Sequence, residues 1–361
     1  MRRRLGCVAV APVLAVAASL AASLAALAPP AAAGGPSLAV FRPLGTWVDV
    51  FDYAPRLQNS GTEPRVTPDS VSDMAALGVK TLYVQVANPD GAPANELTDR
   101  AQLRALLERA HEHDIAVVPW FLPRFLSLAD DFATLKQIVE LRVDGEQFDA
   151  IGLDLESSEL PDIRVRNKRT VAFAKRARKM VGASMPVAAI VYPAVQLEVL
   201  NTTLWPAFPY KAVNRAVDLW MPMSYYTYRD IASGLRSAYR YTVDSVERLR
   251  KRVGDRSVPV HLIGGLAEDS TPDDYFDMTR AARTTDALGW SIYDYATTGS
   301  WAWPYLRGSV SVPTTLQPPT TPPPTTPPPA TPVPPSAAPP TPSSTTTSTT
   351  TTSTSVPPPS T

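Results

Sequence analysis

The chain has 361 residues, and its 34 basic and 34 acidic side chains give a formal net charge of zero. This balance excludes the basic surface that nucleic-acid binding needs, so we expect no nucleic-acid partner. The single cysteine, Cys7, excludes an internal disulfide, and with three histidines in the chain a built-in zinc site is not expected. We therefore expect no metal and no cofactor.

The amino-terminal segment indicates export. Residues 1–33 begin with a charged Met-Arg-Arg-Arg stretch, continue as an Ala- and Leu-rich run and end in small residues, which is typical of a signal peptide cleaved after Ala33. An uncleaved membrane anchor is the alternative, because the apolar run is long enough to span a bilayer. We expect a secreted, extracellular protein with no stable membrane insertion once the signal is removed.

The other end of the chain changes composition at Val312. Residues 312–361 are almost wholly Pro, Thr, Ser and Ala and contain no charged residue. Such a segment buries too little apolar surface to offset the entropy lost on ordering, so we predict a disordered tail. Its composition is typical of a stalk or of a linker that crosses a cell wall, and it predicts association with the cell envelope.

Residues 37–311 suit one large domain, in which apolar runs of strand length alternate with helical patterns. Helix-start signals stand at Thr67-Pro68-Asp69 and Thr271-Pro272-Asp273, and amphipathic periods run over 100–114 and 243–255. The apolar runs are 44–53, 79–88, 115–123, 148–156, 186–193, 217–226, 258–268 and 288–295. Eight such runs predict an α/β fold, a single parallel (β/α)8 TIM barrel. The alternative, a doubly wound open sheet, lacks its Gly-rich phosphate turn here.

The run FDAIGLDLE, residues 148–156, places two carboxylates on an apolar strand. Because residues two apart share a face, its small and acidic residues point one way and its aliphatic residues the other. The acidic face must line the barrel interior, with Glu156 at the mouth and Asp154 one pleat below it. A like charge and a dry site both raise a carboxyl pKa, which suits a general acid acting on a glycosidic oxygen.

This run resembles the strand-4 signature DGxDxDxE of the family-18 chitinases. Asp149, Asp154 and Glu156 stand at matching positions, whereas Ala150 replaces the usual glycine and Gly152 replaces an aspartate. The resemblance implies that Glu156 protonates the leaving oxygen and that Asp154 orients an N-acetyl group, whose carbonyl acts as the internal nucleophile.

The resemblance extends to two later strands. MSYY, residues 223–226, is similar to the MxYD motif of strand 6, with Tyr225 at the position that helps to hold the substrate carbonyl and Tyr226 in place of the aspartate. GWSIYDY, in the last strand, occupies the place of the tryptophan that floors the sugar site. The resemblance implies that Tyr293, or as a second candidate Trp290, takes that part here.

The bacterial family-25 muramidases offer a second resemblance, because they combine an Asp at the end of strand 1 with an Asp-x-Glu on strand 4. Here GTWVDVFDY supplies Asp49 and Asp52, of which Asp49 is nearer the matching position. Both families cut polymers that contain N-acetylated sugars. The expected partner is therefore a polysaccharide or cell-wall glycan.

Polar and aromatic side chains on the strands are the remaining candidates, since rings fit the apolar faces of sugars and polar groups fit their hydroxyls. Barrel filling is the alternative for each of them. The candidate catalytic residues are thus Glu156, Asp154 and Tyr225, and the candidate substrate-binding residues are Asp49, Gln85, Trp120, Tyr192, Tyr226, Trp290, Tyr293 and Asp294.

Other polar residues have plainer interpretations. We expect His111 and His113 to form the polar end of a helix, His261 to be a satisfied core histidine, and the basic helix at 164–180 to present a solvated face.

The sequence as a whole predicts a monomeric, secreted glycoside hydrolase. A carbohydrate-binding barrel that has lost catalysis is the alternative, for which Gly152 and Tyr226 are the motivating departures. In a third interpretation Asp154 and Glu156 pair with arginines for structure alone, but none of the eight apolar runs contains an arginine.

Overall fold

The computed structural model describes residues 35–42, 44–59, 61–88 and 96–308. The predicted signal peptide and the predicted tail lie outside these described residues. Within them the eight expected apolar runs all contain strands, although each strand is shorter than its run. The strands are β1 (Gly45–Val48), β2 (Thr81–Gln85), β3 (Ala116–Phe121), β4 (Ile151–Asp154), β5 (Val187–Val191), β6 (Leu219–Pro222), β7 (His261–Leu266) and β8 (Gly289–Tyr293).

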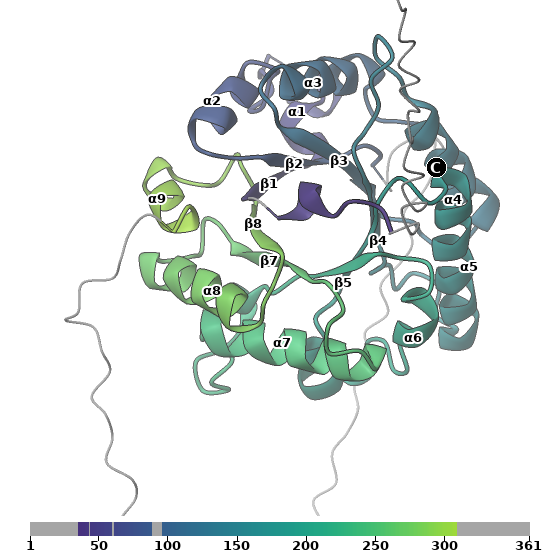
Figure 1. Cartoon of the computed structure of the whole chain (residues 1–361), viewed down its shortest axis with the longest axis vertical. Helices are drawn as coiled ribbons and strands as arrows, with labels where there is room; N and C mark the ends of the chain where they lie inside the picture. Colours follow the sequence, from purple (N-terminus) through teal and green to yellow (C-terminus); the bar gives the residue numbers. More distant parts are fainter. Residues whose placement is uncertain (1–34, 43, 60, 89–95, 309–361) are drawn as a thin grey trace, which may run out of the picture. The chain divides into compact units, whose positions relative to one another are not determined.

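The strands form one parallel sheet in the order β6-β5-β4-β3-β2-β1-β8-β7. Single-residue parallel bridges from Trp220 to Val260 and from Met223 to Ile263 connect β6 with β7, so the sheet curls into a nearly closed ring. Helices surround this ring, as Figure 1 shows. The predicted (β/α)8 barrel is confirmed.

The helices follow the strands around the outside of the barrel. Thr271 caps α8, as predicted, and forms a reciprocal capping box with Asp274; α2 begins at Ser70, three residues after Thr67, and Asp69 makes no side-chain cap bond. The helices are α1 (Val50–Tyr53), α2 (Ser70–Ala76), α3 (Arg100–Glu112), α4 (Leu128–Glu140), α5 (Ile163–Val181), α6 (Tyr210–Val213), α7 (Ala238–Val253), α8 (Pro272–Thr284) and α9 (Trp303–Leu306). Short helical turns are η1 (Ala39–Phe41), η2 (Pro55–Leu57), η3 (Gln196–Leu200), η4 (Tyr226–Tyr228) and η5 (Ser300–Ala302).

The apolar side chains form two clusters, one outside the sheet and one inside it. On β4 the predicted alternation holds, because Ile151 and Leu153 pack in the outer cluster and Ala150 in the inner one. The inner cluster consists of Phe41, Trp47, Tyr83, Val118, Trp120, Ala150, Ala188, Ile190, Leu219, Met221, Met223 and Ile263. The barrel interior is thus filled with side chains, and space for a ligand is left only towards its open end.

The turn η1 covers the end of the barrel at which the strands begin (Figure 1). The Phe41 carbonyl accepts a hydrogen bond of 2.7 Å from Nδ1 of the fully buried His261. A side chain at Gly289 is excluded, because its Cβ would lie 2.4 Å from the Arg42 carbonyl oxygen. His261 is therefore a satisfied core histidine, as expected, and burial lowers its pKa to about 4.

The basic helix α5 presents a mostly solvated face, with one exception. Arg166 is only 3% exposed, and its guanidinium lies over the Trp205 ring, 4.4 Å from the ring centroid. His111 lies at the polar end of α3, as expected, and contacts Glu146 and Asp149. Among the described residues no helix is both long enough and apolar enough to cross a bilayer.

Candidate functional site

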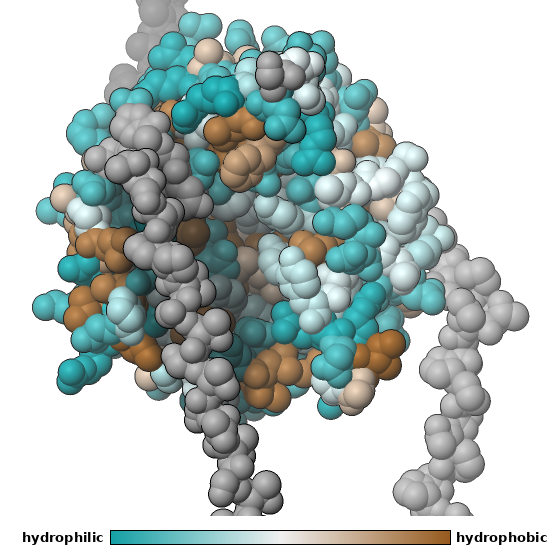
Figure 2. Space-filling model, turned by 180° about the vertical axis from the view of Figure 1, so that it is seen from behind, coloured by the Kyte–Doolittle hydropathy of each residue, from teal (hydrophilic) through white to brown (hydrophobic). Residues whose placement is uncertain are grey.

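A pocket of about 210 Å³ opens at the end of the barrel where the strands finish. The space-filling view in Figure 2 shows this face, opposite the one covered by η1, with a hollow near its centre. The residues that line the pocket are Trp47, Trp120, Asp154, Glu156, Ile190, Met223, Tyr225, Tyr228, Ile263, Leu266 and Tyr293. Both predicted acids, Tyr225, Tyr293 and Trp120 therefore share one cavity.

The two carboxylates of the β4 run lie at the bottom and side of this pocket. Asp154 is 4% exposed, and its Oδ1 has no hydrogen-bond partner in the part of the chain that the structure describes. Burial raises the pKa of Asp154 well above its usual range, and the charge of Glu156 raises it further. Burial also raises the pKa of Glu156 to about 7. At neutral pH the pair therefore retains at least part of its protons.

Tyr192, just after β5, holds Glu156 through a hydrogen bond between their side chains. The hydroxyl donates to the carboxylate and so partly offsets the effect of burial on the Glu156 pKa. The charge of the buried Arg166 lowers the pKa of the Tyr192 hydroxyl, although burial raises that pKa overall. No ion pair to Asp154 or Glu156 is present among residues 35–42, 44–59, 61–88 and 96–308. The interpretation in which Asp154 and Glu156 pair with arginines for structure alone is therefore not supported.

Two tyrosines face the acids across the pocket. The rings of Tyr225, after β6, and Tyr293, at the end of β8, lie 6.3 Å apart between centroids. The Tyr293 hydroxyl donates a hydrogen bond of 3.1 Å to Oδ2 of Asp49. This bond fixes the Tyr293 ring against the pocket and connects the pocket to a second group of acids.

That second group consists of Asp49, Asp52 and Asp294, at the ends of β1 and β8. Their carboxylate oxygens lie within 4.8 Å of one another, so the group has the donors that a cation would need. Each carboxylate already has protein partners: Asp52 pairs with Arg65 at 2.7 Å, Asp49 caps α1, and Asp294 accepts hydrogen bonds from Thr297. Burial, together with the neighbouring acids, raises the pKa of Asp52 to about 7.

Several predicted site residues lie outside the pocket. Gln85 accepts a hydrogen bond from the Val50 amide and so ties β2 to α1. Tyr226 is fully buried, and its hydroxyl contacts Ser270 on the outer side of the barrel. Trp290 donates its indole N–H to the Leu306 carbonyl at 2.8 Å. Trp290 points outwards because it lies on β8 an odd number of residues from the inward-facing Tyr293, whereas Tyr226 lies in η4, beyond the end of β6.

The first acid of the motif, Asp149, is also remote from the pocket. It precedes β4, and its Oδ2 accepts hydrogen bonds from the Val117 amide at 2.7 Å and from His111 at 3.0 Å. Asp149 thus joins the beginnings of β3 and β4, at the opposite end of the barrel from Glu156.

Neighbouring side chains fill the space beside Gly152. A Cβ at this position would lie 3.0 Å from Cδ1 of Ile190 and 3.2 Å from Cβ of Trp120. Trp120 is the direct cross-strand partner of Gly152. The glycine therefore allows the Trp120 side chain to approach β4 closely.

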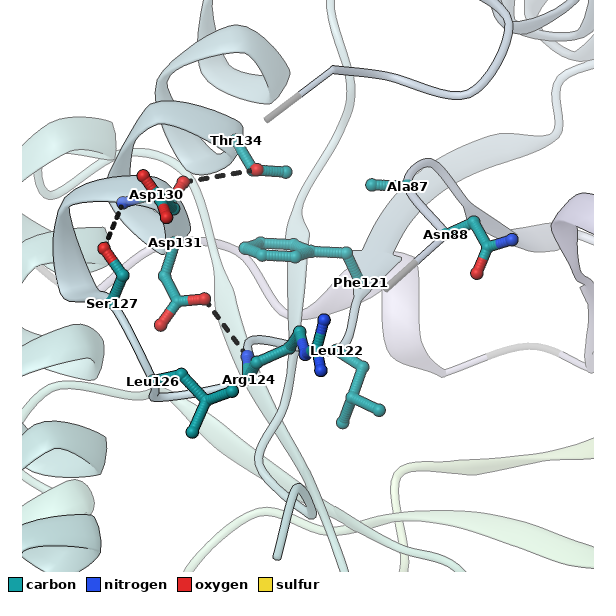
Figure 3. Close-up of a pocket in the computed structure, with 10 residues that line it drawn as sticks. All are labelled: Ala87, Asn88, Phe121, Leu122, Arg124, Leu126, Ser127, Asp130, Asp131 and Thr134. Carbon is teal, nitrogen blue, oxygen red and sulfur yellow. Dashed lines mark hydrogen bonds between the residues drawn. The ribbon is translucent and has the colours of Figure 1, made fainter. Parts of the chain in front are cut away.

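A smaller pocket of about 160 Å³ lies beside the ends of β2 and β3, drawn in Figure 3. It is organised by Asp131, whose carboxylate accepts hydrogen bonds of 3.1 Å from the amides of Arg124 and Phe125. The Arg124 guanidinium is itself paired with Glu159. This arrangement holds the β3–α4 loop, and none of the predicted site residues lines it.

Sequence reasoning missed part of the pocket lining. Trp47, Ile190, Met223 and Ile263 are inward-facing strand residues, so alternation along each strand could have found them. Tyr228 lies in η4, in a connection whose course no local pattern indicates.

The fold is shared with solved structures of proteins that act on glycans. A class V chitinase from Pseudomonas fluorescens is 12% identical with a TM-score of 0.52, and the match covers 74% of this chain and 99% of that chain. The PgaB (BpsB) glycoside hydrolase domain from Bordetella bronchiseptica is 14% identical with a TM-score of 0.50, over 71% of this chain and 94% of that chain. The chain thus has the (β/α)8 barrel fold of glycoside hydrolases.

A chitinase-like agglutinin from Robinia pseudoacacia has the same fold, with 10% identity, a TM-score of 0.50 and coverage of 73% of this chain and 98% of that chain. No family model and no curated protein sequence matches the chain. At these identities the likeness concerns the fold alone, so the function must be argued from the site.

Proposed function

We propose that the chain is a secreted glycoside hydrolase that cleaves a polysaccharide containing N-acetylated sugars. The observation that carries this proposal is the buried pair Asp154 and Glu156, which lines a pocket at the barrel mouth without a cationic partner in the described part of the chain. Two buried carboxylates destabilise a fold unless they are paired or protonated. A proton held on such a pair is available to a leaving oxygen.

In the proposed reaction Glu156 is the general acid. Because burial raises its pKa to about 7, Glu156 carries a proton in neutral and mildly acidic solution. It gives this proton to the glycosidic oxygen as the bond from that oxygen to the anomeric carbon breaks. The resulting carboxylate later accepts a proton from the water that completes hydrolysis, and Tyr192 keeps it in place throughout.

Asp154 and Tyr225 then bind the acetamido group of the sugar that is being cleaved. Asp154 accepts the N–H of the acetamido group, and Tyr225 helps to hold its carbonyl. The carbonyl oxygen forms a bond to the anomeric carbon from the face opposite the leaving group, and water later opens this intermediate with overall retention. Without an N-acetyl group on the sugar this route is closed.

A glycan-binding barrel without catalysis is the second candidate, and Gly152 favours it. The space of the missing acid is occupied by Ile190 and Trp120, so no third carboxylate stands below Asp154 to accept its proton. Binding without cleavage is the expected behaviour if the pair cannot release its protons.

The test is to incubate the full chain and its Glu156→Gln variant with chitin oligomers, peptidoglycan and neutral glucans and to measure new reducing ends. We expect cleavage of the N-acetylated polymers by the wild type and a loss of about 10²–10⁴-fold in the variant. The exposed Glu108→Gln variant is the control and should keep full activity. Binding without cleavage by the wild type would replace the hydrolase with the glycan-binding barrel.

Export belongs to the same proposal and rests on residues 1–33, and wall association rests on residues 312–361. Cell fractionation tests both. We expect the chain in the medium or wall fraction without its first 33 residues; an intact chain in the cytosol contradicts the proposal.

A further inference from the structure

Two residues that line the pocket each have a buried polar atom, one a donor and one an acceptor, that has no hydrogen-bond partner among the described residues. The acceptor is Oδ1 of Asp154, and the donor is the indole nitrogen Nε1 of Trp120, a residue that is 7% exposed. Both residues line the same pocket. A buried donor or acceptor without a partner costs about 1–3 kcal/mol, so such a pair indicates a ligand that supplies both partners.

The other tryptophans show how unusual this donor is. Trp47, which meets Trp120 edge to face with 5.6 Å between ring centroids, donates its indole N–H to Ser291 at 2.8 Å. The indole N–H groups of Trp205, Trp220 and Trp290 donate to Asn167, Asn214 and the Leu306 carbonyl. These four indole N–H groups thus have acceptors, whereas the buried indole N–H of Trp120 has none among the described residues.

The Trp120 ring is held in place beside the acids. Its backbone pairs directly with Gly152, two residues before Asp154 on the same face of β4. The absent side chain of Gly152 lets Trp120 pack against the strand, with 3.2 Å from its Cβ to a Cβ built on the glycine. The Trp47 ring packs edge to face against the Trp120 ring. The glycine at position 152 therefore lets Trp120 pack closely against β4, in the same pocket that Asp154 lines.

We propose that the Trp120 indole N–H donates a hydrogen bond to the acetamido carbonyl of the sugar bound beside Asp154, which makes Trp120 a specificity-determining residue. This inference rests on the proposed function. A secondary amide supplies one N–H for the free oxygen of Asp154 and one carbonyl for Trp120. The carbonyl oxygen has two lone pairs, so in the bound substrate it can accept from Trp120 and Tyr225; one of these two hydrogen bonds is released when that lone pair forms the bond to the anomeric carbon.

The test uses the full chain carrying Glu156→Gln, in which cleavage is slow enough to measure binding. The dissociation constants of N-acetylated chitin oligomers and of the same oligomers with free amines are compared with and without Trp120→Phe. We expect about a 10-fold loss of affinity for the N-acetylated oligomer, and less than about a twofold loss for the free amine, which lacks the carbonyl. Trp220→Phe removes an indole on the outer face and should change neither affinity.

A second measurement needs no change at Trp120. In Glu156→Gln protein with ¹⁵N-labelled tryptophan, one indole N–H resonance should move downfield when the N-acetylated oligomer is added and stay in place with the free-amine oligomer. Equal losses for both oligomers, or no indole shift, overturn the role of Trp120 while cleavage by the wild type still stands. If the wild type neither binds nor cleaves N-acetylated glycans, the proposed function itself is wrong and the role of Trp120 falls with it.

Discussion

Two groups of carboxylates stand at the mouth of this barrel, and they differ in what surrounds them. Asp49, Asp52 and Asp294 accept hydrogen bonds from backbone and side chains, and one of them pairs with an arginine. Asp154 and Glu156 line a cavity, and no described residue forms a hydrogen bond with the Asp154 Oδ1. Raised pKa values occur in both groups, at Asp52 and Asp294 in the first and at Asp154 and Glu156 in the second. A raised pKa alone therefore does not separate a supporting cluster from a reactive pair, whereas unsatisfied hydrogen bonding inside a cavity does.

The largest expected difference between the groups is in the rate of cleavage. Asp154→Asn replaces the carboxylate that accepts the acetamido N–H with an uncharged, weaker amide acceptor and should lower kcat/KM on N-acetylated oligomers by about 10²-fold or more. Asp52→Asn should lower it by less than about threefold, because Asp52 does not line the pocket. Steady-state kinetics on both variants measures this. Similar losses in both would show that the two groups act as one site.

Restoring the missing acid should damage the fold of the pocket. In Gly152→Asp the new side chain meets Ile190 and Trp120, and an additional carboxylate is buried beside Asp154. We expect a loss of about 1–3 kcal/mol in the free energy of unfolding from overpacking, as in Gly152→Ala, and a further loss from the charge. Thermal denaturation compares the two variants. A Gly152→Asp protein as stable as the wild type contradicts the packing described at β4.

The two groups of carboxylates should also differ in their effect on the pH dependence of cleavage. Glu156 acts while protonated, so kcat/KM should fall as pH rises through about 7. Tyr192→Phe removes the hydrogen bond that lowers the Glu156 pKa, so the alkaline limb should move to higher pH by roughly half a unit to one unit. Asp52→Asn should leave this limb in place. A limb that follows Asp52 instead assigns the essential proton to the other group.

The pH dependence of stability should show both groups. A carboxyl group with a raised pKa binds its proton more tightly in the folded state, so its favourable contribution is complete below the unfolded pKa and is lost as pH rises through the folded value. For Asp52 this window runs from 3.8 to about 7. As the pH rises from 4 to 8, the Tm of Asp52→Asn minus the Tm of the wild type should therefore increase by on the order of a few degrees. An unchanged difference across this range contradicts the raised pKa.

The barrel could be predicted because its information is local. Each strand run has its own apolar alternation, and FDAIGLDLE assigns its acids to the interior by parity alone. Parity could also have placed Trp290 on the outer face of β8, where the structure has it, but not Tyr226, which lies in the turn η4. The run at 44–53 is different, because Asp49 caps α1 and ends β1 at Val48.

Long-range contacts could not be predicted from the sequence. Arg166 lies on a helix whose charged residues indicate a solvated face, yet its side chain is buried and its charge lowers the pKa of Tyr192. The bond between Tyr293 and Asp49 joins residues 244 positions apart in the chain. The effect of Gly152 likewise depends on the neighbouring strand, because the glycine is understood only with Trp120 beside it.

The leaving-group dependence of the Glu156→Gln variant tests the central claim most directly. A general acid matters most when the leaving oxygen is a poor one, as in a natural glycan, and little when the leaving group is an acidic nitrophenol. The account predicts that the variant loses about 10²–10⁴-fold on N-acetylated oligomers and far less on a dinitrophenyl N-acetylglycoside. Equal losses on both substrates, or no loss on either, would contradict the assignment of Glu156 as the acid.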